Sequence, residues 1–360
     1  MDIQEKTYDI ERHDLSNDRS LRSWSAADEY LLQAFAEIEQ QPNQLVIYND
    51  RFGYLGCHLN EFTPTIVLTQ KSQEKAISVN LEVNDLPALP FSNPLEPLEK
   101  EMDLALIKIP KSTALFQLFL KQIVHHSTDG VTVICSFMTR HFSPKLLQIA
   151  SEYFEVAEQS KALKKARLLT LSKKKTSNKK EAITSLTYKD QVYQQYWGVF
   201  SADHIDYATQ FFIEHLELKE SDQRILDLAS GNGIIGIEIS KQIPEAEVHL
   251  MDDSFLAVAS AKLNTQSKNI HHHYNNDLSI FEDDSFDLIV TNPPFHFEYE
   301  VNIHIALNLF RDCRRCLKAG GRFQLVASRH LNYRVHLEKL FSEVVVLGEN
   351  EKFLVYNCLM

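Results

Sequence analysis

The sequence predicts an α/β fold with two tandem Rossmann-like domains, each built on a doubly wound parallel sheet. In the C-terminal half, apolar runs of strand length alternate with segments of helix length. Several of these segments have counterparts in the N-terminal half. The 360 residues, of which 44% are hydrophobic, suffice for two globular domains. We expect the domains to cover residues 1–180 and 181–360, with a basic linker ending the first.

The elements of the C-terminal half follow one another in a regular order. The predicted strands are Arg224–Leu228, Val248–Met251, Phe286–Val290, Phe323–Ala327 and Phe353–Tyr356. The predicted helices are Ile234–Gln242, Ala257–Leu263 and a segment from about Asn302 to Leu317. Strands that alternate with helices of this length imply parallel crossover units and a parallel sheet.

The N-terminal half repeats part of this pattern. Met102–Ile107 matches Phe286–Thr291, and the alignment of these runs places Lys108 opposite Asn292. The first half is therefore predicted to be a degenerate copy of the second, without its chemistry. Chance likeness between two α/β domains is the alternative.

The motif Asn292-Pro293-Pro294-Phe295 follows a predicted buried strand. A planar amino group is a poor nucleophile because its lone pair is delocalised. If the Asn292 oxygen and the Pro293 carbonyl accept hydrogen bonds from its two N–H groups, the nitrogen becomes more nearly tetrahedral. Its lone pair then points toward a methyl donor. Pro293 and Pro294 fix the backbone and offer no competing N–H.

Phe295 completes this motif as a ring on which a flipped base can stack. The motif thus predicts methyl transfer to the nitrogen of a planar amine, with these four residues as the catalytic set. The alternative is a proline turn that ends a strand, with Phe295 in the core.

A second motif lies where a doubly wound fold binds a nucleotide, between the first strand and helix of the C-terminal half. Gly231 and Gly233 allow close approach of the backbone to a ligand, and Asp227 precedes them. Asp252, which ends the next strand, is placed to bind two ribose hydroxyls. Together with Gly236 these glycines also fit a dinucleotide fingerprint. The acid before the first glycine and the Asn292-Pro293-Pro294-Phe295 motif both favour S-adenosylmethionine.

Two further residues are candidates for contact with the adenine. Asn276 lies in Tyr274-Asn275-Asn276-Asp277, at the end of a further strand predicted between Val248–Met251 and Phe286–Val290, and Asp277 is the second choice. A plain turn is the alternative for Asn276, because Asn is frequent in turns.

Bulk properties narrow the remaining classes. No apolar run approaches the ~18 residues of a membrane span, and residues 1–5 do not resemble a secretory signal. Five cysteines without a regular framework indicate a reducing compartment. We expect a cytoplasmic monomer. No metal is predicted, because Cys313 and Cys316 fit a packed helix and the run from His271 to His273 fits a solvated loop.

The charge is unevenly distributed. The net charge is −12, yet residues 161–180 contain nine Lys or Arg and no acid. Such a run is either a solvated linker or a contact for RNA phosphates.

With these motifs in view, the chain resembles the bacterial ribosomal RNA guanine-N2 methyltransferases of the small-domain type over nearly its whole length. The segments that carry the resemblance are Gly198–Ser201, Asp227–Gly236, Asp252–Ser254, Asn292–His296 and Arg314–Lys318. It implies class I methyltransferase domains, a cofactor-free N-terminal copy, and a cofactor site that includes Phe200. Residues 326–333, with Arg329-His330, are similar to the branch that modifies the large-subunit RNA.

The chain departs from the family pattern in its cofactor loop. Ala229 replaces the usual first glycine, and Ser230 replaces a common cysteine. Ala229 is counted among the cofactor-binding residues, although alanine at positive φ is strained. Residues 297–300 are more acidic and aromatic than the pattern.

The predicted function is transfer of a methyl group from S-adenosylmethionine to the exocyclic N2 of a guanine in 23S ribosomal RNA. The same chemistry on 16S ribosomal RNA, on adenine N6 in DNA or on a protein glutamine is the alternative. A non-catalytic RNA-binding factor is a hypothesis of a different class.

Overall fold

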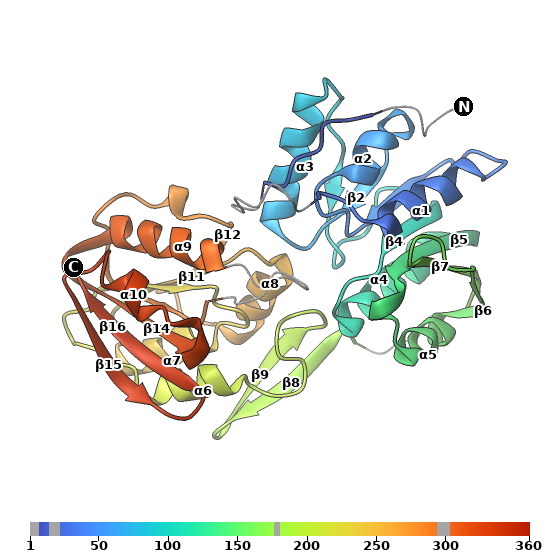
Figure 1. The fold of residues 1–360 in the computed structure, drawn as a ribbon. Coiled ribbons are helices and arrows are strands. Elements are labelled where there is room, and N and C mark those ends of the chain that lie inside the picture. Colours follow the sequence, from blue (N-terminus) through green and yellow to red (C-terminus); the bar gives the residue numbers. More distant parts are fainter. Residues whose placement is uncertain (1–6, 14–21, 176–180, 294–302) are drawn as a thin grey trace. The chain divides into compact units, whose positions relative to one another are not determined.

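The computed structural model describes residues 7–13, 22–175, 181–293 and 303–360. The chain divides into two compact units, Met1–Ala182 and Ile183–Met360. Each unit holds one seven-stranded sheet (Figure 1). In the described part of the chain, no helix is long and apolar enough to cross a membrane.

The C-terminal sheet has the strand order β12-β11-β10-β13-β14-β16-β15. Its strands are β10 (Arg224–Leu228), β11 (Glu247–Asp252), β12 (Ile270–Tyr274), β13 (Phe286–Thr291), β14 (Leu317–Ser328), β15 (Glu343–Glu349) and β16 (Phe353–Leu359). The first five strands of this order are parallel, whereas β16 is antiparallel to both β14 and β15. The prediction of a wholly parallel sheet is therefore wrong at this edge. Only a few residues join β15 to β16, and so short a connection permits a hairpin but no parallel crossover.

Helices cover both faces of this sheet. On one face lie α6 (Tyr207–Glu214), α7 (Ile234–Gln242) and α8 (Phe255–Asn264), and on the other lie α9 (Ile303–Cys316) and α10 (Arg334–Leu337). Successive residues of a strand point to opposite faces of the sheet and pack into two separate hydrophobic cores. Ile225 packs with the first set of helices and Leu226 with the second. Figure 1 shows α9 and α6 on opposite sides of the sheet.

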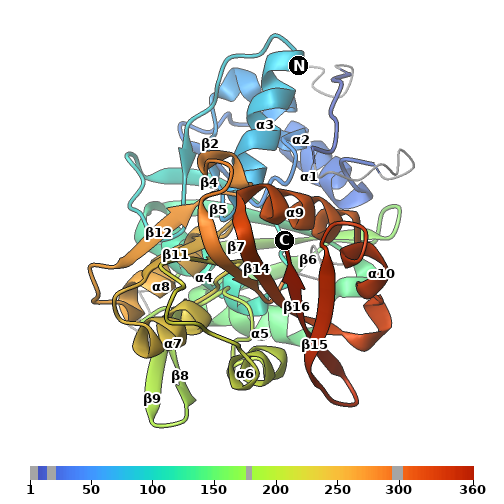
Figure 2. The ribbon, with the colours of Figure 1, turned by 90° about the vertical axis from the view of Figure 1, so that its left-hand side faces the viewer.

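A hairpin precedes this sheet in the same unit. Its strands are β8 (Ile183–Tyr188) and β9 (Gln191–Tyr196), which pair with each other in antiparallel register (Figure 2). This hairpin is not among the elements predicted from the sequence. The hairpin packs against α8, with the buried Ser260 hydroxyl accepting a hydrogen bond of 2.9 Å from the Tyr196 backbone N–H.

The N-terminal sheet repeats the C-terminal topology, with the order β3-β2-β1-β4-β5-β7-β6. Its strands are β1 (Leu45–Tyr48), β2 (Thr65–Val67), β3 (Phe91–Ser92), β4 (Met102–Lys108), β5 (Ser127–Met138), β6 (Phe154–Gln159) and β7 (Ala166–Lys174). Its helices are α1 (Ala26–Ala36), α2 (Tyr54–His58), α3 (Lys71–Val83), α4 (Thr113–His125) and α5 (Pro144–Tyr153). Short 3₁₀ turns occur at Asn60–Phe62 and Thr139–His141, and in the other unit at Leu278–Ile280 and Arg329–Leu331.

The two units agree in detail as well as in strand order. Asp103 accepts hydrogen bonds from the backbone N–H groups of Asn43 and Gln44, and Asp287 accepts the same pair from Gln223 and Arg224. Repetition of both topology and local contacts confirms the prediction of two tandem Rossmann-like domains.

Candidate active site at the carboxyl ends of the strands

The loop after β10 has the tight geometry that the sequence predicts. Ala229, Gly231 and Gly233 have φ values of 58°, 55° and 84°. The strain expected at Ala229 is therefore present, because only glycine occupies this region without a steric cost. A side chain at Gly236 would place a Cβ 2.2 Å from Leu250 Cδ2, so this glycine lets α7 pack closely on the sheet. No described atom lies within 4 Å of the position of a Cβ at Gly231, which leaves that face of the loop open.

Asp227 lies beneath this loop and is fully buried. Its Oδ2 accepts a hydrogen bond of 2.8 Å from the Gly236 N–H. Among the described residues, its Oδ1 has no hydrogen-bond partner. Burial raises the pKa of Asp227 to about 8. A buried carboxyl group with an unused oxygen is suited to a cationic ligand group, which would compensate its charge.

Asp252 ends β11 on the neighbouring strand. Its Oδ2 accepts from the Gly231 N–H at 2.9 Å, and its Oδ1 accepts from the Ser254 N–H at 2.8 Å. Burial raises the pKa of Asp252 to about 6. A carboxylate has about four lone-pair directions, so the two bonds hold the group in place and leave acceptor capacity for ribose hydroxyls.

The predicted adenine contacts follow β12. Asn276 is half-buried, and its Oδ1 has no hydrogen-bond partner among the described residues. Asp277 instead caps the turn at Leu278–Ile280, since its Oδ1 accepts from the Ser279 N–H at 3.0 Å. The structure thus favours Asn276 over Asp277 as a ligand contact. Phe200 lies apart from the strand ends in the sequence and is 75% exposed.

Asn292 follows β13, next to β10 in the sheet. Its Nδ2 donates to Asp206 Oδ2 at 3.1 Å and to Thr209 Oγ1 at 2.9 Å. Its Oδ1 is buried and has no partner among the described residues. The side chain therefore presents an unused acceptor, as the predicted chemistry requires. Pro293 is buried, while Pro294 and Phe295 lie outside the described residues, so their predicted roles stay predictions.

These groups test whether the site fits an S-adenosylmethionine-type cofactor. Strands β11, β10 and β13 are parallel neighbours, so Asp252, Asp227 and Asn292 meet at one edge of the sheet. The unused oxygens of Asp227, Asn276 and Asn292 belong to residues at the carboxyl ends of these strands or directly after β12. Unused oxygens, an open glycine loop and a carboxylate on the next strand match a ligand with an amine, a ribose and a base. The residues fit the cofactor.

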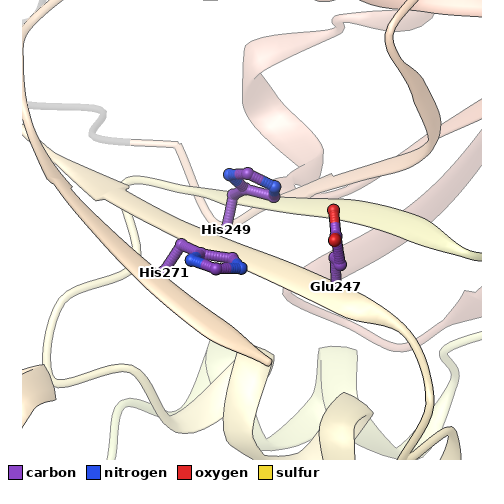
Figure 3. Close-up of side chains that lie close together, drawn as sticks. All are labelled: Glu247, His249 and His271. Carbon is purple, nitrogen blue, oxygen red and sulfur yellow. The ribbon is translucent and has the colours of Figure 1, made fainter. Parts of the chain in front are cut away.

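A second cluster of polar side chains lies on β11 and β12. Glu247, His249 and His271 have ligand-type atoms within 4.8 Å of one another (Figure 3). The run from His271 to His273 forms part of β12, so the prediction of a solvated loop is wrong. Its residues pair in register with β11, which places His271 beside His249.

The contacts of His249 argue against a cation at this cluster. Its Nε2 lies 3.4 Å from Arg224 Nε, which can only donate, and its Nδ1 lies 2.9 Å from His273 Nε2. Burial, followed by the neighbouring His273 and Arg224, lowers the pKa of His249 to about 3. A metal ion would have to displace one of these contacts beside a fixed positive charge. We assign no metal to this cluster.

Asp206 and Thr209 are not among the site residues predicted from the sequence. Asp206 is the N-cap of α6, and its Oδ2 accepts from the Thr209 N–H at 3.1 Å. Such a cap is visible in a sequence as a local signal. Its contact with Asn292, 86 residues away, leaves no local signal.

Comparisons with known proteins agree with this geometry. Residues 1–176 match the RLMG N-terminal domain family, and residues 191–357 match the methyltransferase small domain family. The chain is 32% identical to "Ribosomal RNA large subunit methyltransferase G" of Pseudoalteromonas translucida (strain TAC 125), over 99% of this chain and 96% of that protein. Identity to the protein of the same name in Klebsiella pneumoniae (strain 342) is 33%, over 94% of this chain and 92% of that protein.

A solved structure shares the whole fold. It is the T. thermophilus 16S rRNA N2 G1207 methyltransferase (RsmC) in complex with AdoMet and guanosine, with a TM-score of 0.75 and 20% identity. The alignment covers 93% of this chain and 92% of that one. At this identity the likeness supports the fold, and it confirms the predicted fold class.

Proposed function

Because the chain belongs to the ribosomal RNA large subunit methyltransferase G family, we propose that it methylates the exocyclic N2 of a guanine in 23S ribosomal RNA. S-adenosylmethionine is the proposed cofactor, and it supplies the electrophilic methyl group when bound. The observation that carries the proposal is the buried Oδ1 of Asn292, which has no hydrogen-bond partner among the described residues and lies at the edge of the sheet where Asp227 and Asp252 also lie. We further propose that the enzyme acts as a monomer in the cytoplasm.

The residues of the chain have separate tasks in this proposal. Asp252 would accept hydrogen bonds from the ribose hydroxyls, and the negative charge of Asp227 would compensate a cationic amine of the ligand. The loop around Gly231 and Gly233 would leave room for the ligand. Asn292 Oδ1 accepts one N–H of the target amine, with the Pro293 carbonyl accepting the other. Alignment of this kind accounts for a large share of catalysis when no covalent step by the protein is needed.

The catalytic residues of this proposal all belong to the C-terminal unit. In the N-terminal unit, the sheet registers place Ile47 where the other unit has Asp227. Leu68 occupies the position of Asp252. An apolar side chain cannot accept a hydrogen bond from a ribose or balance a cation. We therefore propose that the N-terminal unit docks RNA and carries out no methyl transfer.

The test is transfer of labelled methyl from S-adenosylmethionine to ribosomal RNA transcribed in vitro, with the two subunit RNAs assayed separately. We expect label in the large-subunit RNA alone, recovered as N2-methylguanine after digestion. An Asn292→Ala protein that folds and binds the cofactor is the control, and it should transfer no more than a trace.

Other outcomes distinguish the alternatives. Label in the small-subunit RNA would keep the chemistry and overturn the substrate. Label in DNA or protein, distinguished by sensitivity to nuclease or protease, would point to another planar amine. Absence of cofactor binding by calorimetry would favour a non-catalytic RNA-binding protein.

A further inference from the structure

The amide group of Asn292 is held by two acceptors that belong to one helix. Its Nδ2 lies 3.1 Å from Asp206 Oδ2 and 2.9 Å from Thr209 Oγ1. Asp206 is the N-cap of α6 and Thr209 lies three residues later in its first turn. Thr209 is buried, so water competes little for its hydroxyl group.

These contacts determine which end of the amide faces the site. An amide side chain has a donor end and an acceptor end of nearly the same shape. A carboxylate oxygen offers only lone pairs, so Asp206 attracts the NH₂ end and repels the oxygen. If the amide of Asn292 were turned over, its oxygen would face this carboxylate and its NH₂ would face the N–H bonds of the substrate. Both contacts would then be repulsive.

We propose that Asp206 and Thr209 are positioning residues that fix the amide orientation of Asn292 and so keep Oδ1 available for the target amine. This inference rests on the proposed role of Asn292. It assigns to the first turn of α6 a part in the reaction, although neither residue needs to touch the substrate.

Asp206 allows a matched pair of variants. Serine is as good an N-cap as aspartate, so Asp206→Ser keeps the start of α6 and removes the acceptor that reaches Asn292. We expect kcat to fall roughly tenfold to hundredfold, with unchanged KM for the cofactor and an unchanged unfolding midpoint. Asp206→Asn should retain most of the rate, because its amide oxygen can occupy the place of Oδ2.

Thr209 allows a second pair. In Thr209→Val the side chain keeps nearly the same shape but loses its hydroxyl group. This variant should have a lower kcat and an unchanged KM for RNA. Thr209→Ser keeps the hydroxyl group and should restore the rate. Loss in the first variant of each pair and recovery in the second would distinguish positioning from a general effect on folding.

The decisive experiment is a double-mutant cycle with Asn292→Ala. If Asp206 acts through Asn292, then Asp206→Ser should lower the residual rate of the Asn292→Ala protein no further. Multiplicative losses in the double variant would overturn the inference, as would wild-type kcat in both Asp206→Ser and Thr209→Val. Full activity of Asn292→Ala alone would instead overturn the proposed role of Asn292.

Discussion

Lys108 occupies in the N-terminal unit the position that Asn292 occupies in the C-terminal unit. Ile107 pairs with Tyr48 in one sheet as Thr291 pairs with Leu228 in the other, and the next residue is Lys108 or Asn292. Each side chain contacts an aspartate at the start of a helix that precedes the first strand. The Lys108 Nζ lies 2.7 Å from the buried Asp28, whereas the Asn292 Nδ2 lies 3.1 Å from Asp206. One framework thus holds an ion pair in one copy and an oriented amide in the other.

This relationship predicts the effect of Asn292→Lys. The lysine can form with Asp206 the ion pair that Lys108 forms with Asp28, so we expect a folded protein that retains cofactor binding. The variant lacks the Oδ1 acceptor and puts a cation near the amine, so transfer should fall at least about 10²-fold to 10³-fold. Single-turnover methylation measures the loss, and calorimetry with S-adenosylmethionine checks binding. A variant that methylates RNA at the normal rate would exclude Asn292 as the acceptor.

We expect Asp227 to make cofactor binding depend on pH. Burial raises its pKa to about 8 in the folded protein, well above the ordinary value of 3.8. Between about pH 4 and pH 8 the folded protein therefore holds a proton on Asp227 that the unfolded chain has lost. The contribution of the raised pKa of Asp227 to stability is fully present below about pH 4 and is lost as pH rises through 8.

A cationic amine of the ligand favours the ionised form of Asp227, so binding should release a proton. We expect affinity for S-adenosylmethionine to rise between pH 6 and pH 8. Calorimetry at pH 6.5 in buffers of different ionisation enthalpy measures the proton released. Asp227→Asn should bind more weakly and release less. Equal proton release by both proteins would show that another group titrates.

Ala229 carries a removable strain. Its φ of 58° costs an alanine about 1–2 kcal/mol. A glycine avoids this cost, but it makes the unfolded chain more flexible and so lowers the free energy of unfolding by about 0.4–1 kcal/mol. Ala229→Gly should therefore raise the free energy of unfolding by up to about 1 kcal/mol, as measured by urea denaturation. Asn49 occupies the same position in the N-terminal unit with φ 62°. Because asparagine tolerates this region, Asn49→Gly is the matched control and should bring no such gain.

Much of the C-terminal fold could be predicted from the sequence because its signals are local. The range of β10 and of α7 follows from an apolar run, a glycine turn and the next apolar segment. The β15–β16 hairpin edge was missed, because a run such as Phe353–Tyr356 does not show in which direction a strand enters a sheet. In the candidate site, the positions of Asp227 and Asp252 at the ends of neighbouring strands were predictable from their spacing. The contacts of Asn292 with α6 were not, because they join residues that only the folded chain brings together.

The basic run at the end of the N-terminal unit divides into lysines with different surroundings. Lys174 Nζ contacts the Ser127 carbonyl and lies 3.5 Å from Asp129, and Lys175 Nζ contacts the Ser151 carbonyl. Lys173 is exposed. A lysine that already binds protein groups must give them up to reach a phosphate, so Lys173 is the better placed of the three to contact RNA.

We therefore expect Lys173→Gln to weaken RNA binding equally for different sequences. It should lower the slope of log K against log salt by about 1, since one phosphate contact is lost. Lys268→Gln, at an exposed lysine just before β12 at the amino ends of the strands, is the charge-matched control and should leave the slope unchanged. Fluorescence anisotropy with a fragment of ribosomal RNA at several salt concentrations measures both. A third variant replaces Lys173, Lys174 and Lys175 together by Gln. If the slope falls only in this variant and not in Lys173→Gln, the run acts as a diffuse charge. Unchanged slopes in every variant would make it a linker.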